Sequence, residues 1–155
     1  MSPQAQISAQ GLSVTPPDGW ETAIYRRPQG PGEQTFPVLH AATVPLPLPR
    51  GDYGSGLVET LRSTDVFVSL LDFGPEAANS ALFAQAGIPA LTPDMYRLKQ
   101  LQRVLPGQAG VQRFFTEAGR AFCLYSVIGS YANRIPLCAR ANQIIGSIHI
   151  QAVAP

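Results

Sequence analysis

The sequence contains few of the side chains that usually carry out chemistry. Its 155 residues include two histidines, two cysteines and a single lysine, Lys99. Charged residues make up 14% of the chain, below the roughly 25% of typical globular proteins. With a formal net charge of +1, no face is expected to be strongly basic. This argues against nucleic acid as the partner, because lysine and arginine chiefly hold its phosphates.

Long apolar runs are also missing. No stretch approaches the ~20 apolar residues of a membrane-spanning helix. Residues 1–10 lack the basic start and apolar run of a signal peptide. We therefore expect a cytoplasmic protein without membrane insertion. Cys123 and Cys138 have no metal-ligand spacing, so we expect both to be reduced, buried thiols.

What the sequence does contain is material for a hydrophobic core. Hydrophobic residues make up 45% of the chain, and its length fits one domain. We predict a flexible arm at 1–10, one globular domain over 11–150 and a tail at 151–155. Segments 66–73 and 122–128 are almost continuously apolar, which is typical of buried central strands. The side chains expected in the core are Phe67, Leu71, Phe115, Phe122, Leu124 and Ile144.

Two turn motifs predict β-hairpins. Pro16-Pro17-Asp18-Gly19 has good turn chemistry, so we expect 12–14 and 22–26 to pair as the first hairpin. Ala118-Gly119 joins two strand patterns with a two-residue connection. In that second hairpin, Phe115 lies opposite Phe122.

Helical patterns occur in two places. Residues 76–86 begin with a glutamate and end before Gly87, which predicts a helix. Residues 133–145 predict a second helix, with Leu137, Ala141, Ile144 and Ile148 on one apolar stripe.

The segment Gly11 to Trp20, with its glycine, alternating strand, turn and tryptophan, resembles the start of PsbP-like domains. This family includes photosystem II extrinsic subunits and LpqN-type lipoproteins, and its members commonly finish with an amphipathic helix, as 133–145 would here. The resemblance implies binding and accessory modules with no catalytic residues to transfer. Together with the patterns, it predicts an α+β fold: a mostly antiparallel sheet of about five to seven strands covered by helices, a PsbP-like sandwich.

Catalytic groups are hard to assemble from this sequence. A triad of Cys123, His40 and Asp72 has no supporting local motif, and an apolar run around Cys123 favours a structural role. Asp72 ends an apolar strand, and we expect it to hydrogen-bond the loop at Gly74-Pro75 rather than act as an acid or base. We predict no catalytic, cofactor-binding or metal-binding residues.

Candidate partner-binding residues gather at element ends, where arginine, proline and aromatic groups are common in interfaces. They are Tyr25, Arg26, Arg27, Pro45, Pro47, Pro49 and Arg50. The leading hypothesis is a non-enzymatic binding or accessory module that contacts a protein partner or a second copy. A structural subunit of a larger assembly and an enzyme with a pocket at the sheet edge are the alternatives.

Overall fold

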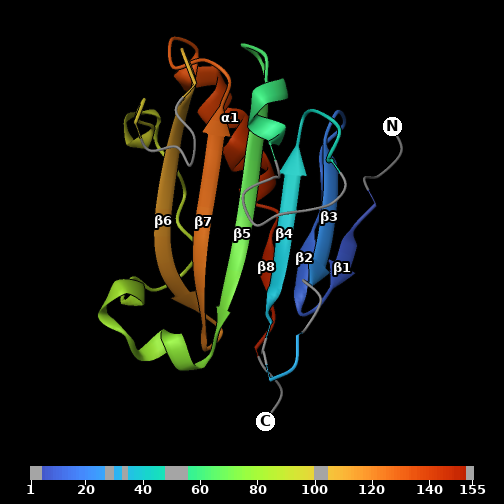
Figure 1. The fold of residues 1–155 in the computed structure, drawn as a ribbon, viewed down its shortest axis with the longest axis vertical. Coiled ribbons are helices and arrows are strands. Elements are labelled where there is room, and N and C mark those ends of the chain that lie inside the picture. Colours follow the sequence, from blue (N-terminus) through green and yellow to red (C-terminus); the bar gives the residue numbers. More distant parts are fainter. Residues whose placement is uncertain (1–4, 27–29, 33–34, 48–55, 100–104, 153–155) are drawn as a thin grey trace.

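Two antiparallel β-sheets make up most of the structure (Figure 1). The computed structural model describes residues 5–26, 30–32, 35–47, 56–99 and 105–152. The larger sheet has five strands in the order β3 (Glu21–Arg26), β4 (Pro37–Ala42), β5 (Val66–Gly74), β7 (Arg120–Ile128) and β6 (Ala109–Glu117). The smaller sheet has three, in the order β1 (Ile7–Ala9), β2 (Leu12–Val14) and β8 (His149–Ile150).

Helices contribute little, so the predicted α+β sheet covered by helices is wrong, and the fold is mostly β. In the described part of the chain, α1 (Arg134–Ile145) is the one α-helix. The other helical segments are short 3₁₀ helices: η1 (Leu57–Thr60), η2 (Glu76–Asn79), η3 (Ala81–Phe83) and η4 (Pro93–Met95). No helix among the described residues is long and apolar enough to cross a membrane.

The helix expected over 76–86 is replaced by η2 and η3. Ser80 separates the two with an extended backbone, at φ −85° and ψ 153°, which an α-helix cannot accommodate. Leu82 and Phe83 are the only large apolar residues of this segment. Because they are adjacent, they cannot form the apolar stripe that holds a surface helix against a core.

The hairpin formed by β6 and β7 confirms its prediction. Ala118 and Gly119 both have positive φ, at 54° and 77°, as a two-residue turn between right-twisted strands requires. Phe115 lies opposite Phe122 in this register, and both are fully buried. Their rings stack with centroids 5.4 Å apart.

The predicted first hairpin is wrong, because β2 and β3 belong to different sheets. β2 pairs with β1 and β8, whereas β3 pairs with β4. Residues 16–19 therefore link the two sheets. The hairpin partner of β2 is β1, which lies in the predicted arm, and its turn is Gln10-Gly11, with φ of 55° and 78°. Alternating apolar residues show that a strand has one buried face, but not which strand lies beside it.

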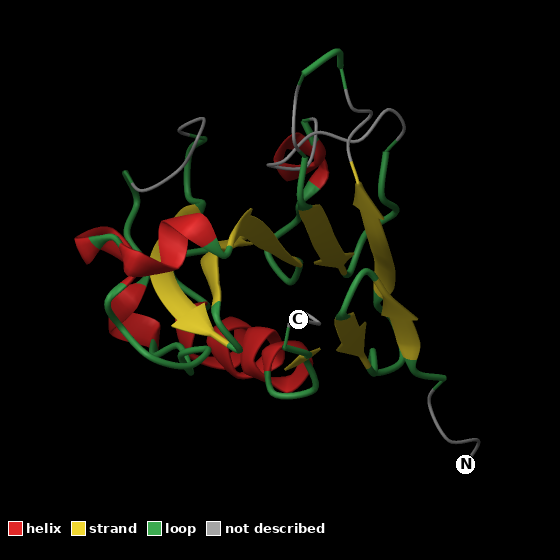
Figure 2. Cartoon of the chain, turned by 90° about the horizontal axis from the view of Figure 1, so that it is seen from below, coloured by secondary structure: helices red, strands yellow, loops and turns green. Residues whose placement is uncertain are grey.

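Each face of the larger sheet has its own apolar core. Seen from below, α1 and the smaller sheet lie on one side of the larger sheet (Figure 2). We call this side the helix face; Leu39, Val68 and Phe122 contribute to its core. On the opposite face, η1 and the segment after β4 cover Phe67 and Cys123.

The predicted core and C-terminal helix are confirmed. All six side chains expected in the core are no more than 4% exposed. α1 buries three residues of its predicted stripe, Leu137, Ala141 and Ile144, against the sheet. The fourth, Ile148, lies after the end of the helix but is buried in the same core.

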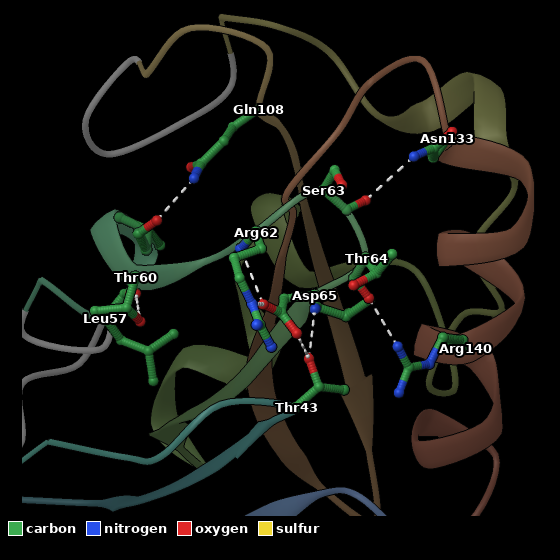
Figure 3. A network of polar contacts seen from close by, with 12 residues as sticks. Thr43, Leu57, Thr60, Arg62, Ser63, Thr64, Asp65, Gln108, Asn133 and Arg140 are labelled. Atoms are coloured by element: carbon green, nitrogen blue, oxygen red, sulfur yellow. Dashed lines mark hydrogen bonds and ion pairs between the residues drawn. The ribbon is translucent and has the colours of Figure 1, made fainter.

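A polar network holds the start of β5 in place (Figure 3). The Asp65 carboxylate accepts hydrogen bonds from the Thr43 hydroxyl and the Arg62 backbone N–H, both at 2.9 Å. Burial raises the pKa of Asp65, but the hydrogen bonds from Arg62 and Thr43, together with the positive charge of Arg62, outweigh it and leave that pKa below its usual value. The backbone N–H of Gly129 donates to the Asp65 carbonyl at 2.9 Å.

The same loop anchors α1 from outside the core (Figure 3). Arg140 donates to the Thr64 carbonyl oxygen at 2.7 Å, and Asn133 donates to that of Ser63 at 3.3 Å. The helix is thus attached to the beginning of β5 by polar contacts as well as by its apolar stripe.

The outer edge of β6 is paired at both ends. Gly110 exchanges two backbone hydrogen bonds of 2.9 Å with Arg97. Thr116 accepts from the N–H of Gly87 and donates to the carbonyl of Gln85, both at 2.8 Å. Among the described residues, only the middle of this edge, around Gln112 and Phe114, has no such backbone partner.

Candidate functional site

A cavity of about 370 Å³ lies at one end of the larger sheet, the lower end in Figure 1. Here β5 ends, β7 begins, and the turn between β1 and β2 approaches them. The cavity is lined by Gln10, Gly11, Arg26, Phe36, Pro37, Asp72, Gly74, Pro75, Arg120 and Ala152. Its size falls within the range of about 300–1,000 Å³ that is typical of small-ligand sites.

A buried ion pair between Asp72 and Arg120 forms one wall of the cavity. Their side chains are 2% and 6% exposed. Nε of Arg120 donates to Oδ2 of Asp72 at 3.1 Å, and Nη2 donates to the same oxygen. Oδ1 of Asp72 accepts the backbone N–H of Gly74 at 2.7 Å. Both carboxylate oxygens are therefore occupied, which confirms the predicted structural role of Asp72 beside the Gly74-Pro75 loop.

The remaining donors of Arg120 connect the two sheets. Nη1 donates to the carbonyl oxygen of Gln151 at 3.1 Å, and Nη2 reaches that of Gln10 at 3.5 Å. The guanidinium also lies over the Phe122 ring, 5.2 Å from its centroid. One arginine thus joins the five-stranded sheet to two chain segments of the smaller sheet.

Two glycines in the cavity wall allow their neighbours to pack closely against the backbone. Gly74 has φ of 85°, and a Cβ at this position would collide with the ring of Phe36. Gly11 has φ of 78°, and a Cβ there would lie 2.9 Å from Nη1 of Arg120. Both positions combine left-handed backbone with close approach, so any larger residue would be strained.

Arg26 places an exposed positive charge at the cavity. It ends β3 opposite Pro37, and its Nε donates to the carbonyl oxygen of Thr35 at 2.9 Å. Among the described residues, no hydrogen bond to either Nη atom is found. Of the predicted partner-binding residues that the structure describes, Arg26 is the one that lines this cavity.

Tyr25 points away from Arg26, because neighbouring residues of a strand face opposite sides of the sheet. The Tyr25 ring meets that of His40 edge to face at 5.2 Å, and His40 meets Phe67 in the same way. Tyr25 therefore belongs to the core face opposite the helix.

The predicted proline cluster lies at the other end of the β3–β4 hairpin. Pro45 is exposed and lines a second, open pocket of about 340 Å³ with Trp20 and Glu21. Leu46 is buried and holds the segment against the sheet, and Pro47 is half-buried. The candidates Arg27, Pro49 and Arg50 lie outside the described residues.

The triad of Cys123, His40 and Asp72 does not assemble. Cys123 pairs with Leu71 and Asp72 with Phe122, so the thiol and the carboxylate lie on opposite faces of β5 and β7. Both cysteines are free and buried, as predicted. Burial raises the pKa of the Cys123 thiol to about 11, although a hydrogen bond from Gln112 opposes this. In the described part of the chain, no three His, Cys, Asp or Glu residues are arranged to hold a metal ion.

The main residue that sequence reasoning missed is Arg120. A signal for it exists: Asp72 is a lone charge at the end of one apolar strand, and Arg120 is a lone charge at the start of another. If two such strands pair antiparallel, these two ends meet. No comparable signal indicates that Gln10 and Gln151 approach the same arginine.

Comparisons with known proteins add no relative: no family model, curated protein or solved structure matches this chain.

Proposed function

We propose that this chain is a non-enzymatic binding module that takes a segment of a protein partner at the cavity beside Arg26. The observation that carries this proposal is that two of the three charged side chains among the described residues of the cavity wall are paired and buried, whereas the third, Arg26, is exposed. The buried side chains of Asp72 and Arg120 form an ion pair with each other and hydrogen-bond backbone groups. The exposed guanidinium of Arg26, the half-buried Phe36 and the exposed Pro75 are available to a ligand.

The PsbP-like resemblance predicts the same class of function. We expect the module to act in the cytoplasm, where its two buried cysteines would stay reduced.

Selection of peptides from a random library on the immobilised protein tests the proposal. Selected peptides should bind the wild type and lose at least tenfold in affinity to Ala152→Trp, which fills the cavity rim. Ala139→Trp is the matched control, because Ala139 is exposed on α1 and does not line the cavity. Equal effects of the two tryptophans, or no selected peptide, would contradict the proposal.

A second candidate is self-association through an exposed apolar patch. Phe73 is 41% exposed at the end of β5, and Leu82 in η3 is 59% exposed. The Phe73 ring contacts Phe83, and Phe83 contacts Phe114. The exposed patch is therefore packed on buried and half-buried aromatic rings. Light scattering after size-exclusion chromatography distinguishes the candidates. A dimer that becomes monomeric in Leu82→Asp would favour an assembly subunit.

A further inference from the structure

We propose that the cavity binds a ligand with one carboxylate on a compact apolar body, and that Arg26 holds the carboxylate. This inference rests on the proposed function, because it concerns the same site. It names the chemistry of the group that enters the site and the residue that recognises it.

The sign and size of the ligand charge follow from the cavity lining. Arg26 and Arg120 are positive and Asp72 is negative. Because Asp72 and Arg120 form a buried pair, one positive charge remains unmatched among the described lining residues, and it belongs to Arg26. A monoanion neutralises this charge. A dianion would leave a negative charge beside Asp72, and a cation would be repelled by Arg26.

The hydrogen bonding of Arg26 favours a carboxylate among monoanions. Its Nε is held by the Thr35 carbonyl at 2.9 Å, which fixes the orientation of the guanidinium. The two Nη atoms then present parallel N–H donors, which match the two oxygens of a carboxylate. Orienting the guanidinium before binding also lowers the entropy lost when a ligand arrives.

The walls beside Arg26 favour an apolar body. Phe36 and Pro37 precede and begin β4, and Pro75 follows β5. Gly74 adds no side chain and packs directly on the Phe36 ring. A compact hydrocarbon group can bury apolar surface against these residues while its carboxylate stays at Arg26.

The carboxylate can come from a small molecule or from the C-terminus of a partner chain that ends in an apolar residue. The chemistry at Arg26 is the same in both cases. The experiment therefore needs one probe for each source and a neutral analogue for each probe.

The first arm uses sodium hexanoate and its neutral analogue hexanamide, with binding followed by amide NMR shifts. We expect saturable shifts at Gly11 and Gly74 with hexanoate, and at least tenfold weaker binding of hexanamide. Arg26→Gln should weaken hexanoate at least tenfold. The matched control Arg97→Gln removes an exposed arginine that does not line the cavity, and it should change the affinity less than twofold. Equal binding of the acid and the amide, or no effect of Arg26→Gln, overturns the proposal.

The second arm uses a heptapeptide that ends in valine, with a free or an amidated C-terminus. If only the free acid binds and Arg26→Gln abolishes it, the carboxylate belongs to a partner chain end, and both proposals stand. If hexanoate binds and library peptides do not, the carboxylate site stands while the protein-binding function fails. If cavity-binding peptides bind equally well as acid and amide, the function stands and the carboxylate site fails.

Discussion

Asp72 and Arg120 contact each other diagonally across β5 and β7. Asp72 lies directly opposite Phe122, and Arg120 lies two residues earlier on the same face of β7. The arginine side chain thus runs over the Phe122 ring to reach its partner. The pair joins the end of one central strand to the start of the other, although 48 residues separate them in sequence.

Breaking this pair should strongly destabilise the protein. We expect Asp72→Ala to lower the free energy of unfolding by about 3–5 kcal/mol, because it leaves the Arg120 charge buried without its partner. A urea titration measures the change. The double variant Asp72→Leu/Arg120→Met should recover part of the loss, since apolar replacements remove both buried charges. A double variant less stable than Asp72→Ala would show that the backbone contacts of Arg120 matter more than the ion pair.

The stack of Phe115 and Phe122 is expected to dominate the core on the helix face. Phe122→Ala should cost about 3–5 kcal/mol, the usual range for a buried aromatic truncation. The exposed Phe73 gives a comparison, and Phe73→Ala should cost less than half as much. Similar losses for the two variants in denaturant titrations would be inconsistent with the burial described.

Gly129 is required by a close backbone approach. A Cβ at this position would collide with the carbonyl oxygen of Arg62, which cannot rotate away as a side chain could. We expect Gly129→Ala to cost about 3 kcal/mol, at the upper end for overpacking. Gly19→Ala is the control: Gly19 has φ of 86° with nothing within 4 Å, so only the backbone strain of about 1 kcal/mol applies. Thermal unfolding should rank the two variants in this order.

The turn between β6 and β7 can be improved. Ala118 has φ of 54°, a conformation that asparagine adopts more readily than alanine. Ala118→Asn creates the Asn-Gly sequence favoured in such turns and should stabilise the protein by about 0.5–1 kcal/mol. The midpoint of thermal unfolding should therefore rise. A lower midpoint would indicate that the turn has another conformation.

Stability should fall in alkaline solution through Cys123. Burial raises the pKa of its thiol from the ordinary 9.0 to about 11. The folded form thus disfavours the thiolate, and the contribution of this group is complete below pH 9 and is lost as the pH rises toward 11. The slope approaches about 1.4 kcal/mol per pH unit. Urea titrations of the wild type and Cys123→Ala between pH 8 and pH 11 isolate this term as the difference between their slopes. Parallel curves would refute it.

Local patterns predicted the parts of this fold that depend on neighbouring residues. The β6–β7 hairpin follows from a two-residue turn between apolar strands, and α1 follows from its stripe. The pairing of β2 with β8 could not be predicted, because the strands are far apart in sequence and short. Likewise, 110 residues separate Gln10 from Arg120. The candidate cavity depends on such distant approaches, so the sequence indicated only its individual residues, Arg26 and Asp72.

The paired ends of the β6 edge have a consequence for behaviour at high concentration. An exposed strand edge can serve as a template for another chain, and the sheets then grow from molecule to molecule. Here Arg97 and the segment at 85–87 occupy the outward-facing groups of Gly110 and Thr116. An incoming strand would find only a short gap between these two contacts. The protein's own chain thus blocks the addition of further strands, as in amyloid, at both ends of this edge.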